Sequence, residues 1–107
     1  MTAVWLECRA EAQVAEMDAL CAEFLTTLRE GHPHLDLQHG SEAVPRIVLW
    51  LTHADARGLG ASLSWIAADG RQTEGTELRT AFFDRASDPT LRRRFFVALL
   101  QQNPLPF

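Results

Sequence analysis

The chain has 107 residues, which is enough for one domain, and 47% of them are hydrophobic, so a core can form without disulfides or a structural metal. All ten of its basic residues are arginine, and the absence of lysine excludes Schiff-base chemistry, a lysine general base and the P-loop phosphate site. The formal net charge of −4 disfavours a general nucleic-acid binder, because such proteins neutralise phosphates with basic residues.

The N-terminal part of the chain predicts a strand followed by a helix. Residues 3–9 alternate weakly between apolar and polar side chains, which favours a short strand over an extension of the helix. Gly31 and Pro33 supply the signals that end the helix. From about Glu11 to Glu30, apolar residues recur on one helical face, at Val14, Met17, Cys21, Phe24 and Leu28.

The middle of the chain predicts up to four strands. Residues 34–38 alternate and favour a short edge strand. Residues 46–53 predict the strongest strand, which we place centrally because both of its faces are apolar and are expected to be covered. Residues 59–67 and 76–83 alternate on either side of Asp69-Gly70, a pair typical of a tight hairpin.

A second helix is predicted near the C-terminus. Asp88 can cap it, Pro89 suits its first position, and it ends near Gln102, before Asn103-Pro104. The order β-α-β-β-β-β-α predicts a single α+β domain over residues 1–107, with an antiparallel sheet of four to five strands and two amphipathic helices in a second layer. In the alternative, residues 55–65 are helical and the fold is a ferredoxin-like βαββαβ core with an extra C-terminal helix.

The two cysteines and the N-terminus bear on the compartment. Cys8 and Cys21 lack the CxxC spacing of redox and zinc sites, and we expect two buried free thiols. The chain shows no signal-peptide pattern, and no apolar run approaches the roughly 20 residues of a membrane span. We therefore expect a cytoplasmic protein, from a bacterium whose genes are rich in G and C, with no membrane or nucleic-acid partner.

A histidine-rich segment is the first candidate for chemistry. His34 and Asp36 share a face if residues 34–38 are extended, and an imidazole with a carboxylate is a plausible ligand set for Zn²⁺. His53 and Asp55 would join them if the two strands pair. Polar residues on the wet side of an edge strand explain the same pattern, and we expect no cofactor.

Three consecutive arginines begin the last helix. A helix N-terminus favours anions, so Arg92 and Arg93 are candidate anion-binding residues. Successive helical residues point about 100° apart, so at most two of the three arginines converge on one anion. In the alternative, Asp84, Asp88 and the acidic first helix neutralise them.

The chain holds more large apolar side chains than a two-layer domain of this size needs. The excess predicts a partner surface, and a non-catalytic interaction or accessory module that forms a homodimer or binds another protein. The alternative is a small-ligand-binding protein or small enzyme with an apolar pocket between sheet and helices, walled by Trp and Phe with a His or Asp at its mouth. No catalytic residues are predicted, and the candidate interface residues are Phe96, Leu100, Phe107 and Trp50.

Overall fold

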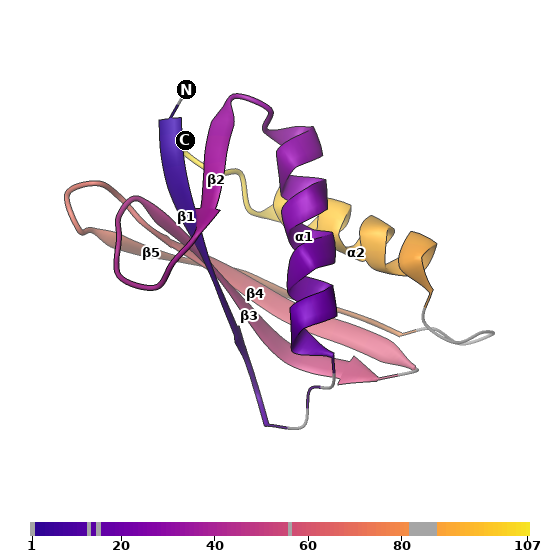
Figure 1. Ribbon diagram of the computed structural model, residues 1–107. Helices are drawn as coiled ribbons and strands as arrows, with labels where there is room; N and C mark the ends of the chain where they lie inside the picture. Colours follow the sequence, from indigo (N-terminus) through magenta and orange to yellow (C-terminus); the bar gives the residue numbers. More distant parts are fainter. Residues whose placement is uncertain (1, 13, 15, 56, 82–87) are drawn as a thin grey trace.

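The computed structural model describes residues 2–12, 14, 16–55, 57–81 and 88–107. The elements follow the predicted order, and the fold is α+β with five strands and two helices (Figure 1). They are β1 (Thr2–Ala10), α1 (Met17–Gly31), β2 (Leu35–His39), β3 (Arg46–Asp55), β4 (Gly58–Ile66), β5 (Gln72–Ala81) and α2 (Pro89–Gln102). Residues 82 and 83, the predicted end of the last strand, lie outside the described residues.

The sheet is mixed, which corrects the expectation of an antiparallel sheet. Its order is β2-β1-β3-β4-β5, and β1 runs parallel to both β2 and β3, whereas the β3-β4 and β4-β5 pairs are antiparallel. Side-chain alternation locates strands but carries no information on their direction. The ferredoxin-like alternative is also wrong, because residues 58–66 form strand β4 and not a helix.

A six-residue segment explains how β3 comes to be parallel to β1. His39 at the end of β2 pairs with Leu6, and Arg46 at the start of β3 pairs with Trp5 on the other side of β1. Residues 40–45 therefore only step across β1, and the chain continues in the same direction. Gly40 N donates to Leu6 O at 3.1 Å, and a Cβ on Gly40 would lie 2.7 Å from Trp5 Cδ1, so the crossing needs a residue without a side chain.

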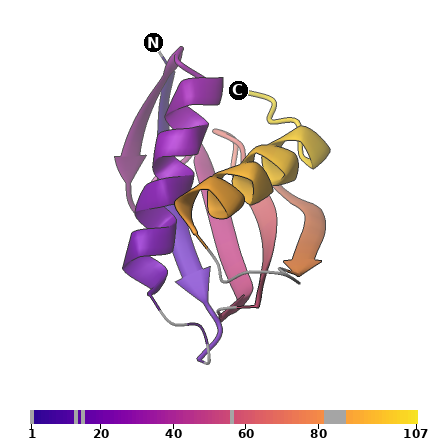
Figure 2. The ribbon, with the colours of Figure 1, turned by 90° about the vertical axis from the view of Figure 1, so that its right-hand side faces the viewer.

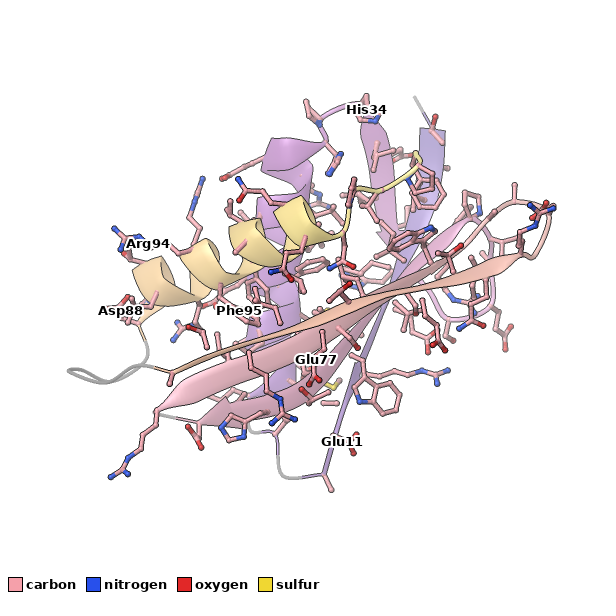
Figure 3. The ribbon with its side chains drawn as sticks, turned by 180° about the vertical axis from the view of Figure 1, so that it is seen from behind. Glu11, His34, Glu77, Asp88, Arg94 and Phe95 are labelled. Carbon is pink, nitrogen blue, oxygen red and sulfur yellow. A yellow bond between two sulfur atoms is a disulfide. The ribbon has the colours of Figure 1, made fainter. Side chains whose placement is uncertain are left out.

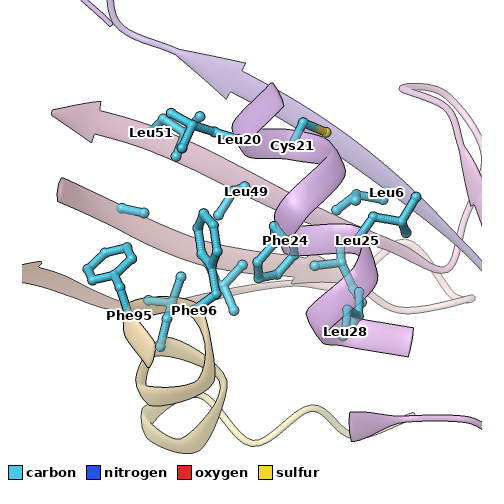
Figure 4. Close-up of a cluster of buried hydrophobic side chains, with 14 of the residues drawn as sticks. Leu6, Leu20, Cys21, Phe24, Leu25, Leu28, Leu49, Leu51, Phe95 and Phe96 are labelled. Carbon is cyan, nitrogen blue, oxygen red and sulfur yellow. The ribbon is translucent and has the colours of Figure 1, made fainter. Parts of the chain in front are cut away.

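Both helices cover the same face of the sheet (Figure 2). Phe24 of α1 and Phe96 of α2 meet edge to face over the sheet, with ring centroids 5.4 Å apart. They pack with the inward-facing residues of the central strands (Figure 4), among which Leu6, Ile47, Leu49, Leu51, Leu59, Ala61 and Leu63 are all buried. The alternating patterns of β3 and β4 predicted this core correctly.

On the opposite face of the sheet, the described residues form no helical layer. β3 is central, as predicted, but its Val48 and Trp50 are only half-buried, so the expectation that both of its faces are covered is wrong. Both helices lie on one side, so among the described residues the other side of the sheet carries only the side chains of the strands themselves. We call this second side the open face.

Helix α1 begins six residues later than the sequence pattern indicates. Glu11 N donates to Leu51 O at 3.0 Å, which extends the pairing of β1 with β3 and keeps this residue out of a helix. Glu16 then takes a left-handed conformation, with φ 59°, directly before the first helical residue. The helical spacing of apolar residues extends back to Val14, so the sequence pattern placed the start of the helix too early.

A disulfide joins Cys8 of β1 to Cys21 of α1, which corrects the expectation of free thiols. Helix α1 packs back over β1, and the two Cα atoms lie 6.2 Å apart, within the usual range for a disulfide. A separation of 13 residues in sequence gave no sign of this proximity.

The C-terminal end of α2 is fixed to β5 through a buried asparagine. Asn103 is 2% exposed; its Oδ1 accepts from Thr76 N at 2.7 Å, and its Nδ2 donates to Thr76 O at 3.2 Å and to Leu99 O at 2.9 Å. The contact lies where the β4-β5 register shifts, so the side chain satisfies backbone groups that the irregular pairing leaves over. Gly75 makes room, because a Cβ there would lie 2.2 Å from Asn103 Oδ1.

Candidate functional site

The open face is organised as rows of side chains that cross the sheet. In Figure 3, Glu11 and Glu77 lie on the side of the sheet away from Phe95 of α2. The strand registers align three rows: Trp5, Arg46, Ile66 and Gln72; Glu7, Val48, Ser64 and Glu74; and Arg9, Trp50, Ser62 and Glu77. These rows surround a shallow hollow of about 540 Å³.

A buried ion pair lies at the centre of this face. Glu7 is only 8% exposed, and its Oε1 lies 3.1 Å from Arg46 Nε, while Arg9 pairs with Oε2. Among the described residues, neither Glu7 Oε1 nor Arg46 Nε makes a well-oriented hydrogen bond, so the contact is an ion pair. Arg46 Nη1 also donates to Ala43 O at 3.0 Å, which ties the pair to the segment that crosses β1.

Trp50 lies beside this pair and is held on two sides. Its Nε1 donates to Glu11 Oε1 at 3.0 Å, and the guanidinium of Arg9 lies 5.9 Å from its ring centroid, a cation–π arrangement. Trp50 therefore presents a fixed, half-buried aromatic ring on the open face, as the prediction of an interface residue requires. Whether a partner contacts it stays a prediction.

The other three predicted interface residues occupy different environments. Phe96 is 0% exposed and belongs to the core, because its ring fills the space between Phe24 and Phe95; its assignment to an exposed surface is corrected. Leu100 and Phe107 are partly buried and pack against the edge of the core. Leu100 lines a groove of about 390 Å³ between α1 and α2, next to Val97, which is 37% exposed.

The predicted anion-binding arginines are paired with helix α1. Arg92 makes two hydrogen bonds to the Glu23 carboxylate, at 2.6 and 2.8 Å, and Arg93 pairs with Glu30. The bond to Glu23 raises the pKa of Arg92 above its ordinary value. The acidic first helix thus neutralises the two arginines, as in the alternative drawn from the sequence, and anion binding by them stays a prediction.

The histidine-rich segment forms a contact with the C-terminal tail. The rings of His32 and His34 meet edge to face at 5.9 Å, and His34 Nε2 donates to Phe107 O at 3.1 Å. Burial lowers the pKa of His32, and the neighbouring His34 adds to this effect. These contacts attach the tail to the start of β2, an arrangement that sequence spacing did not predict.

The predicted metal ligands are not gathered into one cluster. Asp36 accepts from Gln38 Nε2 at 3.4 Å, and β3 pairs with β1 and β4, so His53 and Asp55 pair with each other at 3.1 Å instead of joining β2. No group of three or more His, Cys, Asp or Glu side chains in the described ranges could hold a metal ion. Zn²⁺ at His34 and Asp36 stays a prediction that lacks a third ligand.

A further hollow of about 540 Å³ lies between α1 and the strands β1 and β2. Asp18 and His39 lie on its lining together with the Cys8–Cys21 disulfide, as the alternative of a pocket between sheet and helices requires. Among the described residues its lining includes no Trp or Phe, so the aromatic walls expected from the sequence are not seen in this part of the chain.

Comparison with known proteins identifies a shared fold. No protein-family model and no curated protein matches the chain. Among solved structures, the PelC dodecamer from Paraburkholderia phytofirmans matches with a TM-score of 0.71 at 11% sequence identity, over 94% of this chain and 86% of that chain. A dodecamer of a single-residue variant of PelC from the same organism gives a TM-score of 0.69 at 12% identity, over 97% of this chain and 88% of that chain. At this identity the likeness shows the fold alone.

Proposed function

We propose that this chain is a non-catalytic subunit that associates with further copies of itself and acts as an accessory or interaction module. The observation that carries the proposal is that the fold matches, over nearly the whole chain, structures that are dodecamers. Fold likeness alone transfers no function, so the proposal also needs surfaces suited to contact.

Two surfaces support it. The open face presents Val48 and Trp50 half-buried, and Glu11 and Arg9 hold the Trp50 ring, so a partner could bury this ring at little entropic cost. The groove between the helices presents Val97 and Leu100, with the Arg93–Glu30 pair at its edge. Apolar residues ringed by charged ones are typical of interfaces between subunits. A homodimer is the simplest such assembly.

We also place the protein in an oxidising compartment. The Cys8–Cys21 disulfide supports this location over the cytoplasm expected from the sequence, because disulfides persist where thiols are not kept reduced. None of the described helices combines the length and the apolar character that crossing a membrane demands. A bacterial origin stays part of the proposal.

Sedimentation velocity over a range of micromolar concentrations tests self-association. We expect the wild type to sediment as a species heavier than its 12.0 kDa chain. Val97→Glu should weaken the association if the helix groove takes part, because a carboxylate would be buried against apolar groups. Val44→Glu is the matched control, since Val44 is 38% exposed on the segment that crosses β1. A wild type that stays monomeric throughout the range would overturn the proposal.

A small polar ligand in the hollow of the open face is the second candidate function. The hollow has the volume of a ligand site, and the fixed charges of Glu7 and Arg46 line it. A thermal-shift screen of amino acids, nucleotides and carboxylic acids, repeated with Glu7→Gln, tests this function. No shift with any compound would exclude those classes.

A further inference from the structure

Strand β5 leaves a long edge of the sheet without a neighbour. It ends the strand order, spans ten residues, and has no partner on its outer side among the described residues, whereas the other edge strand, β2, has only five residues. An exposed edge can pair with another strand through its backbone, and side chains decide which strand it accepts.

The charged residues of β5 are held in position on the open face. Glu77 Oε1 accepts from Thr52 Oγ1 at 2.8 Å and from Arg79 Nε at 3.1 Å. The side chain of Arg79 is 70% exposed and that of Glu77 is 39% exposed, so both remain accessible to a further partner. Leu78, between them, points to the other side and packs against the core.

The order of these residues is self-complementary. When β5 pairs antiparallel with β5 of another copy about a two-fold axis at Leu78, Glu77 faces the partner's Arg79, and Arg79 faces the partner's Glu77. Leu78 then faces the partner's Leu78, and Thr76 faces the partner's Thr80. Opposite charges and paired threonines are the favourable cross-strand combinations.

Neighbouring registers are unfavourable. An axis at Glu77 places two glutamates opposite each other, and an axis at Arg79 does the same with two arginines, and like charges in directly opposed positions repel. A shift by one residue without a two-fold axis would place the Glu77 and Arg79 side chains of the partner on the opposite face of the joined sheet. Among the two-fold registers with an axis at Glu77, Leu78 or Arg79, the charge pattern therefore favours the one at Leu78.

We propose that a second copy of the chain binds to β5 in this register, so that two five-stranded sheets join into one of ten strands. This inference rests on the proposed self-association and names its surface. The paired sheets leave the helix groove and the open face available for larger assemblies.

Charge reversal at two positions tests the pairing. Glu77→Arg alone and Arg79→Glu alone each convert both symmetric contacts into like-charge contacts, and each should weaken association by about tenfold or more. The double variant Glu77→Arg with Arg79→Glu restores both contacts and should associate like the wild type. An equimolar mixture of the two single variants should form heterodimers, because both charge contacts between the unlike chains are attractive.

Arg71→Glu is the matched control, since Arg71 is an exposed arginine just outside the strand. Thermal melting of each variant verifies that it folds, and sedimentation of the single variants and their mixture gives the result. Single variants that associate like the wild type, or a mixture that fails to recover association, would overturn the β5 pairing and leave self-association standing. A monomeric wild type would overturn both.

Discussion

Asn103 satisfies three backbone contacts from a position with almost no access to water. Its carboxamide contacts both polar backbone groups of Thr76 and the carbonyl of Leu99. A buried backbone group without a partner costs more than a hydrogen bond gains. A single polar side chain therefore sets where helix α2 ends relative to the edge strand.

Truncation of this residue should be costly. We expect Asn103→Ala to lower the free energy of unfolding by about 3 kcal/mol, because it leaves buried polar groups unpaired. Urea denaturation measures the change. Gln102→Ala removes the neighbouring exposed carboxamide and should change stability by less than about 0.5 kcal/mol. Equal effects of the two substitutions would contradict the role assigned to Asn103.

His32 should make stability depend on pH. Burial and His34 lower its pKa in the folded state, so the unfolded chain binds a proton more readily than the folded one. The resulting stability is present above the ordinary histidine pKa of 6.5 and is lost as the pH falls through it toward the lower folded value. Melting temperatures measured from pH 8 to pH 5 should fall, and the fall should be smaller for His32→Gln. An unchanged profile in that variant would assign the dependence to other groups.

At the scale of elements, the disulfide joins the first strand to the first helix. Cys8 and Cys21 join β1, which ends at Ala10, to α1, which begins at Met17. The disulfide closes a short loop, and this closure lowers the conformational entropy of the unfolded chain. Helix α1 is also held against α2 by two ion pairs, in which Arg92 and Arg93 of α2 contact glutamates of α1.

Reduction of this bond should destabilise the fold. With a sequence separation of 13 between the cysteines, loop-closure entropy predicts a loss of about 3 kcal/mol. Urea denaturation with and without dithiothreitol measures it, and the double variant Cys8→Ala with Cys21→Ala should show no response to the reductant. Equal stability of the oxidised and reduced wild type would show that packing alone fixes α1 on β1.

Local patterns predicted the elements well because neighbouring side chains determine them. The alternation around Leu49 and Leu63 located two strands and their buried faces, and Asp88 with Pro89 located the start of α2. Asp88 Oδ1 accepts from Leu91 N at 2.9 Å, as a capping residue does.

Contacts between distant residues were beyond such patterns. The parallel direction of β3 depends on the step across β1 at Gly40, and the disulfide depends on how α1 lies over Cys8. For the candidate site, the sequence indicated Trp50. It did not indicate the ion pair of Glu7 with Arg46, because these two residues are 39 positions apart in the chain. Glu7 shares a face with Trp5 and Arg9, and this polar side of an inner strand was the available signal.

At the scale of the whole molecule, the two described helices leave one face of the sheet and both of its edges uncovered. The helices cover the first face, so other copies could bind at the open face, at the outer sides of β2 and β5, or at the groove between the helices. The two edges allow different symmetries. Pairing of β5 with the β2 of another copy is heterologous and continues to further copies, whereas pairing of β5 with β5 closes after two.

Hydrogen exchange distinguishes these symmetries. With the axis at Leu78, residues 75–81 of the two copies pair, so the outward-pointing backbone amides of these residues should gain protection as the protein concentration rises, because this edge becomes hydrogen-bonded to a partner. Residues 35–39 of β2 should exchange at the same rate at every concentration and so serve as an internal control. A heterologous ring would protect both segments together, and association through the helix groove or the open face alone would protect neither edge. Protection of β5 without β2 is therefore the pattern that the charge order of Glu77 and Arg79 requires, and protection of both edges would exclude it.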